Sequence, residues 1–494
     1  MRYSIITELI ASMLLLHLGS LSAQDFNSYK RQQQDAFRVY RQKTQEEWDT
    51  YRRKVNAEFA EFLGIPWEEK AGEAPKDEPE AVPDVPPVVF PELEIVVPED
   101  RPIDVEVTIP MVEDKPLPVA PIPYRPKPAE KTISFSFYGT PGRVRFDMAK
   151  LVSLKGTDEK AVSRFWAGLS GESYDNVVAD CLDIQSDRDL CDWAYYKMCE
   201  QVAQTLYTDK NGQSVFLAWL LAQSGFATRL GRENGRIHLL LGTSTLVYGR
   251  PYWKLGDGYY SLYDGERITS MHIMDATFPN TSPLRMRMRA FNRFDGSGSA
   301  ARSLRSDRYP AATAEVVCDN NLLAFMQDVP ISAIEGTDVT DFLKYADVYL
   351  SELAADALYR ALRPQIEGKT EAEAANILLN FVQTAFEYKT DGETWGRERP
   401  FFPEETLYYP FCDCEDRAIL FCRMVRDLMA LETAFVVYPG HLAAAVHFTE
   451  DIPGDYFTID GKRFLVCDPT YVNAPIGETM RSMSNRAAQV FLWD

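Results

Sequence analysis

The sequence is short of basic residues, of cysteine and of long apolar runs. Lys and Arg number 52 against 73 Asp and Glu, which gives a formal net charge of −21. Nucleic acids and anionic membranes repel so acidic a surface, and the charge argues against both as partners. After the first residues, no apolar segment is long enough for a membrane-spanning helix. Eight cysteines in 494 residues are too few for a disulfide scaffold, and their pairing is not readable from the sequence.

The first 23 residues have the pattern of an export signal. Arg2 supplies a positive charge, residues 9–18 form a short apolar stretch, and residues 21–23 (LSA) resemble a cleavage site. No cysteine follows that site, so a lipid anchor at the new N-terminus is not indicated. We therefore expect an exported protein, periplasmic or extracellular, with no integral membrane segment after residues 1–23 are removed.

Residues 24–67 predict an amphipathic helix. Aromatic residues between positions 25 and 63 alternate at steps of three and eight, which makes an eleven-residue repeat. Such a repeat predicts one aromatic stripe and, if the helix pairs, a right-handed twist. The stripe either packs on the protein's own body, as is usual, or mediates self-association or docking. The aromatic positions are Phe26, Tyr29, Phe37, Tyr40, Trp48, Tyr51, Phe59 and Phe62.

The composition changes over residues 68–130. Half of the 30 prolines lie between Pro75 and Pro128, mixed with Asp, Glu and Val. This composition predicts an extended, polyproline-like spacer without a packed core, lying in part along the globular surface.

From residue 131 onward the pattern is that of globular α+β domains. We place a first domain at 131–335 and a second at 336–494. Strand-like runs fall at 131–146, 237–241 and 245–248, and helical patterns at 158–206, 214–224 and 340–388. Thr370 and Glu373 have the spacing of a helix capping box.

The residues with the clearest chemistry begin at Cys414. The run CEDRAILF has apolar residues at helical spacing, so a buried helix starts at or next to this thiol. There the thiol faces unpaired N–H groups and the positive end of the helix dipole, which favour the thiolate. His441 opens a strand-like run, and Asp468 follows another, so adjacent antiparallel strands would bring the two together. A thiol, an imidazole base and a carboxylate that fixes the imidazole tautomer make a nucleophilic triad.

These motifs, in this order, resemble the transglutaminase-like superfamily of papain-fold enzymes. DCEDRAILF is followed by GH with small apolar residues and then by a strand that ends in DPTY. The lead-in, with FEY at 386–388, Asp391, WG at 395–396 and PEETL at 403–407, is similar to the bacterial cysteine-proteinase branch. The resemblance spans about residues 370–475.

The resemblance implies an α+β, papain-like domain with Cys414, His441 and Asp468 as catalytic residues. We expect no cofactor and no metal. One departure is Phe411-Cys412, where a glycine commonly precedes the Asp-Cys pair.

Several residues offer alternatives to this triad. Cys412 is a rival nucleophile but lies outside the helix register. Cys467 is expected to be a buried thiol or a disulfide partner. A zinc site made by Cys412, Cys414 and Cys422 fits poorly, because the paired CxxC spacings are absent.

His447 is a rival base on the same strand face as His441, since six residues is an even step. Gly440 before His441, together with the resemblance, favours His441. Glu415 and Asp416 either contact substrate or stabilise the first turn of the helix through its dipole.

The sequence does not identify the group that donates a hydrogen bond to the oxyanion. The backbone N–H of Cys414 is the default, and side-chain candidates are Gln383, Trp395 and Tyr409.

Residues 211–241 repeat the order of helix, turn and strand. His238 stands as far from Asn211 as His441 stands from Cys414. No cysteine occupies the nucleophile position, where Asn211 or Ser214 would stand. The region is either a degenerate, non-catalytic copy or an ordinary helix–strand–strand unit that happens to align.

Two classes of function remain. The first is an exported thiol-dependent hydrolase (peptidase or amidase), or an acyltransferase, acting on amide bonds of peptide, protein or cell-wall peptide through an acyl-enzyme. The second is a catalytically silent binding or scaffold protein that keeps the fold. The complete triad favours the enzyme, and the need to exclude water for transfer favours hydrolysis.

Overall fold

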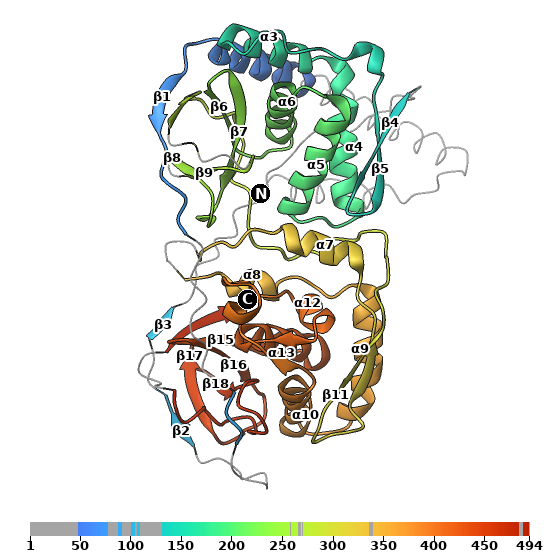
Figure 1. Cartoon of the computed structure of the whole chain (residues 1–494), viewed down its shortest axis with the longest axis vertical. Helices are drawn as coiled ribbons and strands as arrows, with labels where there is room; N and C mark the ends of the chain where they lie inside the picture. Colours follow the sequence, from blue (N-terminus) through green and yellow to red (C-terminus); the bar gives the residue numbers. More distant parts are fainter. Residues whose placement is uncertain are drawn as a thin grey trace, which may run out of the picture. The chain divides into compact units, whose positions relative to one another are not determined.

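The computed structural model describes residues 48–77, 87–90, 100–103, 106–108, 131–256, 258–264, 268, 270–334, 339–483 and 488–493. Over these residues the chain is a mixed α+β protein, which confirms the predicted class at that level (Figure 1). None of the described helices is long and apolar enough to cross a membrane. The predicted export signal of residues 1–23 lies outside the described residues.

The predicted amphipathic helix is described only from residue 48, and residues 48–63 are helical. Phe59 is 4% exposed. Its ring lies 4.9 Å from that of Trp166 and 5.1 Å from that of Phe278, measured between centroids. Phe62 is 54% exposed. At Phe59, therefore, the stripe packs on the protein's own body, while the aromatic residues before Trp48 lie outside the described residues.

The predicted proline-rich spacer contributes three short strands to the two large sheets, and its other described residues form isolated bridges at Glu73 and Val89. Phe90 is buried, and its ring meets that of Tyr471 at 5.3 Å. Pro102 is accommodated because it lies in a two-residue strand at a sheet edge, where a missing N–H donor costs little. The strands are β1 (Glu68–Ala71), β2 (Arg101–Pro102) and β3 (Glu106–Thr108).

The middle module combines an antiparallel sheet with a layer of helices (Figure 1). The predicted strand pair at 131–146 is confirmed as a hairpin, whereas residues 245–248 form only an isolated bridge between Val247 and Ser332. The helices are α3 (Glu159–Leu169), α4 (Asp175–Asp187), α5 (Asp192–Leu206) and α6 (Lys210–Gln223), with short 3₁₀ turns at Met148–Lys150 and Glu172–Tyr174. The strands are β4 (Thr132–Phe137), β5 (Thr140–Arg145), β6 (Thr228–Glu233), β7 (Arg236–Thr243), β8 (Tyr252–Leu255), β9 (Gly258–Leu262) and β10 (Ser270–Ile273).

The C-terminal module is built around α13 (Cys414–Met429), which packs against the sheet strand β16 (His441–His447). The predicted capping box at Thr370 and Glu373 is confirmed. The other helices are α7 (Asn320–Asp328), α8 (Phe342–Ala346), α9 (Glu352–Ile366), α10 (Glu371–Thr384), α11 (Asp391–Thr394) and α12 (Pro403–Tyr408). The other strands are β11 (Arg302–Arg305), β12 (Thr313–Val316), β13 (Glu387–Tyr388), β14 (Phe411–Cys412), β15 (Glu432–Tyr438), β17 (Asp455–Ile459), β18 (Lys462–Cys467) and β19 (Gln489–Trp493).

The two large sheets share one strand order. The C-terminal sheet runs β17-β18-β16-β15-β19-β3, with β2 added at the β17 edge, and the middle sheet runs β8-β9-β7-β6-β10-β1. A long helix directly precedes the consecutive strands of each sheet, α13 before β15 to β19 and α6 before β6 to β10. The β15–β16 turn pairs Tyr438 with His441, and the β6–β7 turn pairs Glu233 with Arg236.

The hairpin registers align the two sheets residue by residue. The β17–β18 turn pairs Ile459 with Lys462, and the β8–β9 turn pairs Leu255 with Gly258. Counting from these turns, Arg236 stands at the position of His441 and Asp264 at the position of Asp468. The predicted alignment of His238 with His441 is therefore wrong by two residues, because α6 starts at Lys210 rather than Asn211 and β6 has six residues where β15 has seven.

Candidate active site

Cys414 is the first residue of α13, as the sequence predicted, and it is 2% exposed. Asp413 occupies the N-cap position before it. The thiol Sγ donates to the Glu415 carboxylate oxygen Oε2 at 3.1 Å. As the first residue of α13, Cys414 lies at the positive end of the helix dipole, which stabilises a negative charge, whereas the Glu415 carboxylate beside the thiol opposes one.

His441 and Asp468 form a buried pair. The imidazole Nε2 lies 2.9 Å from Asp468 Oδ2, and the residues are 4% and 2% exposed. β16 and β18 are adjacent and antiparallel, with Ala444 opposite Cys467, which brings the start of one strand beside the end of the other. This is the juxtaposition expected from the sequence.

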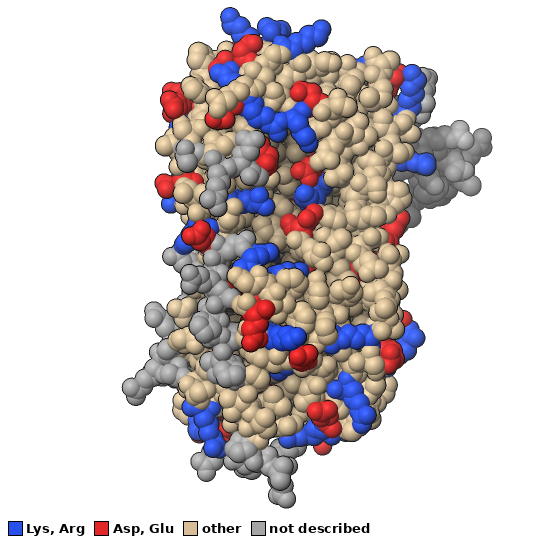
Figure 2. Space-filling view, viewed as in Figure 1, with Lys and Arg blue, Asp and Glu red and all other residues tan. Residues whose placement is uncertain are grey.

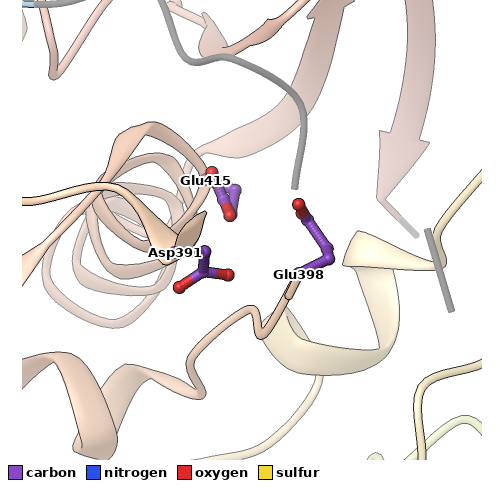
Figure 3. A group of neighbouring side chains, drawn as sticks. All are labelled: Asp391, Glu398 and Glu415. Carbon is purple, nitrogen blue, oxygen red and sulfur yellow. The ribbon is translucent and has the colours of Figure 1, made fainter. Parts of the chain in front are cut away.

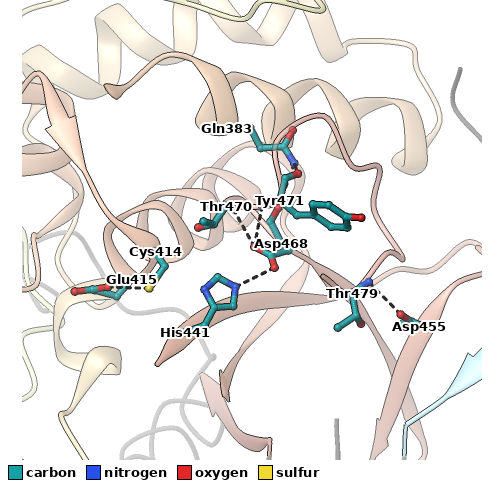
Figure 4. A network of polar contacts seen from close by, with 9 residues as sticks. All are labelled: Gln383, Cys414, Glu415, His441, Asp455, Asp468, Thr470, Tyr471 and Thr479. Atoms are coloured by element: carbon teal, nitrogen blue, oxygen red, sulfur yellow. Dashed lines mark hydrogen bonds and ion pairs between the residues drawn. The ribbon is translucent and has the colours of Figure 1, made fainter. Parts of the chain in front are cut away.

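The second imidazole nitrogen faces the thiol side of the site. His441 Nδ1 is buried and has no hydrogen-bond partner among the described residues. In Figure 4 the Cys414 sulfur lies on the side of the ring away from Asp468. A carboxylate on Nε2 favours the tautomer with its proton there, which leaves the Nδ1 lone pair available as a base.

The loop after β18 fixes Asp468. The backbone N–H groups of Thr470 and Tyr471 donate to Asp468 Oδ1 at 2.9 and 3.2 Å, so both carboxylate oxygens are engaged. Gln383 Nε2 donates to the carbonyls of Asp468, Tyr471 and Ala474 at 3.1, 2.8 and 3.1 Å. Gln383 therefore clamps this loop from α10 (Figure 4).

Of the three predicted oxyanion side chains, Trp395 and Tyr409 keep a donor that no hydrogen bond among the described residues uses. Trp395 Nε1 is buried without a partner among the described residues. The amide protons of Gln383 are committed to the 468–474 loop, which does not suit it to the predicted donor role. The Tyr409 hydroxyl accepts from Gln327 at 3.3 Å, and its ring stacks on Phe401 at 4.8 Å.

The rival residues serve packing and strand pairing. Cys412 is 1% exposed on β14, and burial raises the pKa of its thiol to about 11. His447, at the far end of β16, donates a hydrogen bond from Nδ1 to the Arg463 carbonyl at 2.9 Å. Burial raises the pKa of the Cys467 thiol, which donates to the Leu465 carbonyl at 3.6 Å.

A group of buried carboxylates lies next to the thiol. Oxygen atoms of Asp391, Glu398 and Glu415 lie within 4.8 Å of one another (Figure 3). Asp413, Glu415 and Asp416 form a second such group. Burial and the nearby Asp391 raise the pKa of Asp416. Carboxylates this close share protons or hold a hard divalent cation such as Ca²⁺, so these residues could bind a metal.

Neither carboxylate group was predicted from the sequence, from which no metal was expected. The two groups are the metal-ligand clusters found among the described residues, and the Cys412, Cys414 and Cys422 combination is in neither. The eight cysteines carry thiols rather than disulfides in the described part of the chain. The many acidic residues between positions 391 and 416 could have suggested a carboxylate cluster. Which of their side chains meet is decided by the fold and cannot be read from the sequence.

The middle module has a different group at the position of the base. Arg236 Nη2 lies 3.7 Å from Asp264 Oδ2, and buried His238 contacts the same carboxylate through Nδ1. The first residue of α6 is Lys210, with Asp209 as its N-cap. This module thus keeps a carboxylate paired with an imidazole, but the imidazole comes from a position two residues further along the strand, and α6 starts without a thiol.

The C-terminal arrangement contains the groups that nucleophilic acyl chemistry uses. A thiol at a helix start, an imidazole with one engaged and one available nitrogen, and a carboxylate held by two backbone donors meet its requirements. Comparisons with protein-family models, with curated proteins and with solved structures find no match.

Proposed function

We propose that the C-terminal module is a thiol-dependent amidase or peptidase of transglutaminase-like, papain-type fold. The observation that carries the proposal is the buried His441–Asp468 pair at 2.9 Å, with Nδ1 turned to the side of Cys414. In this mechanism Nδ1 takes the proton of Cys414, and the thiolate attacks a carbonyl carbon. His441 then returns the proton to the leaving amine, and water resolves the acyl-enzyme.

The fold supports the same assignment. α13 packs against β16, so the helix that bears the nucleophile and the strand that bears the base form one rigid unit. The export pattern of residues 1–23 points to an extracellular or periplasmic peptide as substrate. On the face shown in Figure 2, Lys and Arg lie among Asp and Glu rather than in one basic field, which does not favour a nucleic-acid substrate.

The middle module supports a role in recognition. With Arg236 at the base position and no thiol at the start of α6, it is a non-catalytic relative of the C-terminal module in this proposal. A cavity of about 240 Å³ is lined by Tyr248 and Arg250 of the middle module and by Arg397 and Arg399 of the C-terminal module. Glu398, between those two arginines, belongs to the carboxylate group beside Cys414. A peptide bound there would be held by both modules.

Hydrolysis is expected to dominate over transfer. Incubation with an unfolded protein such as casein should release new α-amino groups, because water reaches the acyl-enzyme. A fluorescent primary amine in the same reaction should remain unincorporated. Amine release is measured by fluorogenic labelling and amine incorporation by gel fluorescence.

Cys414→Ala is the control and should abolish release, whereas Cys412→Ala should not. Incorporation of the amine without release would instead identify an acyltransferase. Equal behaviour of wild type and Cys414→Ala in both assays would identify a silent scaffold and contradict the proposal.

A further inference from the structure

The hairpin β11–β12 precedes the catalytic residues in sequence and contacts two segments of the active site. Leu304, Ala314 and Val316 are each 1% exposed, and β12 lies against α9. The ends of the hairpin are tied together, since Ser299 N–H donates to the Cys318 carbonyl at 2.8 Å. We refer to residues 299–318 as the strap. Its burial shows that it is an integral part of the C-terminal module.

One end of the strap holds the segment that leads to the nucleophile. Arg302 Nη1 donates to the Leu407 carbonyl at 3.2 Å and to the Tyr409 carbonyl. Its guanidinium also lies over the Phe386 ring, 5.4 Å from the centroid. Both carbonyls stand at the end of α12, from which the chain runs through β14 into Cys414. A planar guanidinium can hold two carbonyls in a fixed relation, which a point charge cannot do.

The turn of the strap, between β11 and β12, reaches the buried side chain of Asn380 on α10. Ser306 Oγ donates to Asn380 Oδ1 at 2.7 Å, and the Arg308 N–H donates to the same oxygen at 3.1 Å. Asn380 Nδ2 in turn donates to Asn473 Oδ1 at 3.0 Å and to Gln383 Oε1 at 3.3 Å. The Asn380 side chain thus connects the strap to the loop after β18 through hydrogen bonds.

The chain of contacts ends at the backbone carbonyl of Asp468, the residue whose carboxylate orients His441. Gln383 Oε1 accepts from Asn473 N–H at 3.0 Å, and Gln383 Nε2 donates to the Asp468 carbonyl at 3.1 Å. Every amide in this series is 3% exposed or less, apart from the half-buried Asn473. Buried polar networks of this kind fix one geometry, because a broken link leaves groups without partners.

We propose that the strap positions the Cys414 segment and the Asp468 loop relative to each other, with Arg302 and Asn380 as positioning residues. The proposal rests on the proposed function, because it assigns a purpose to the strap in the same site. The proposal also places the start of the catalytic unit before the strap, upstream of the boundary at residue 336. A fragment beginning at residue 336, the boundary predicted from sequence, would lack the strap and so would be poorly active.

Variants of the strap in the full chain test the proposal. Arg302→Met should slow alkylation of Cys414 by iodoacetamide roughly tenfold, because small displacements at a reacting centre have large effects on rate. Arg302→Lys should restore only part of the rate. Arg305→Met is the matched control, since Arg305 lies on the same strand with an exposed side chain, and it should leave the rate unchanged.

Hydrogen exchange provides a readout that does not depend on chemistry. Arg302→Met should speed amide exchange over residues 405–414, whereas Asn380→Leu should speed it over residues 468–474. Wild-type exchange in both segments, with a wild-type alkylation rate per folded molecule, would overturn the proposal even if both variants melt earlier. Failure of wild-type Cys414 to alkylate selectively would count against the proposed function alone, since the exchange result still decides the role of the strap.

Discussion

Replacement of His441 by alanine is expected to lower the rate of amide hydrolysis by roughly 10³-fold, with little loss of folded protein. His441 supplies the base that removes the Cys414 proton and the acid that protonates the leaving amine. Its Nδ1 is buried without a partner among the described residues, so removal of the imidazole breaks one hydrogen bond, to Asp468, and one ring contact, with Tyr438. The rate is measured by release of α-amino groups, and folding by circular dichroism.

His447→Ala is the matched control for this change. It removes an imidazole from the same strand, and that imidazole hydrogen-bonds the Arg463 carbonyl rather than the triad. The control should keep the wild-type rate. The assignment of the base would be wrong if His447→Ala removed the activity and His441→Ala preserved it.

Asp468→Asn should lower the hydrolysis rate by ~10²- to 10⁴-fold while the protein stays folded. Two backbone N–H groups, of Thr470 and Tyr471, point at Oδ1 and will select the amide oxygen for that position. The new NH₂ group must then face His441 Nε2, which forces the imidazole proton onto Nδ1. An imidazole protonated at Nδ1 cannot accept the thiol proton, so the base is lost through its tautomer.

Asp455→Asn serves as the control for Asp468→Asn, because it also replaces a buried carboxylate on the same sheet. Asp455 accepts from the Thr479 N–H at 3.0 Å and pairs with Arg101 at 2.8 Å, away from the thiol. It should lower the melting temperature without changing the rate per folded molecule. A loss of rate in Asp468→Asn that merely follows its loss of folded protein would contradict the tautomer argument.

The relation between Cys414, His441 and Asp468 could be inferred from sequence because each part is local. Helical spacing after Cys414 set the start of α13, and a turn at Gly440 placed His441 at the beginning of a strand. His441 and Asp468 each lie at one end of a strand with an alternating pattern. Their contact could therefore be predicted on the single assumption that β16 and β18 are neighbours. Hydrophobic periodicity and turn residues carry that information.

The supporting contacts could not be inferred, because they join residues far apart in the chain. Arg302 meets Tyr409, and Asn380 meets Asn473, across more than ninety residues in each case. Neither residue belongs to a motif, and a half-buried arginine looks like any surface cation in a sequence. The convergence of Asp391, Glu398 and Glu415 was missed for the same reason.

The middle module shows where residue counting misleads. Equal sequence separations suggested that His238 corresponds to His441, whereas the hairpin registers place Arg236 there. The error arises because α6 starts one residue before Asn211 and β6 is one residue shorter than β15, so equal sequence separation does not mean equal position in the fold. Strand pairing, which is observed only in the fold, settles the correspondence.

Mapping cysteine reactivity tests the central claim most directly. The mature protein is treated with limiting iodoacetamide at about pH 6, where an ordinary thiol with a pKa of about 8.5 is almost fully protonated. Labelled positions are then identified by mass spectrometry. We predict selective labelling of Cys414 that is lost in His441→Ala. Uniform slow labelling of all eight cysteines, or a disulfide at Cys414, would contradict the account.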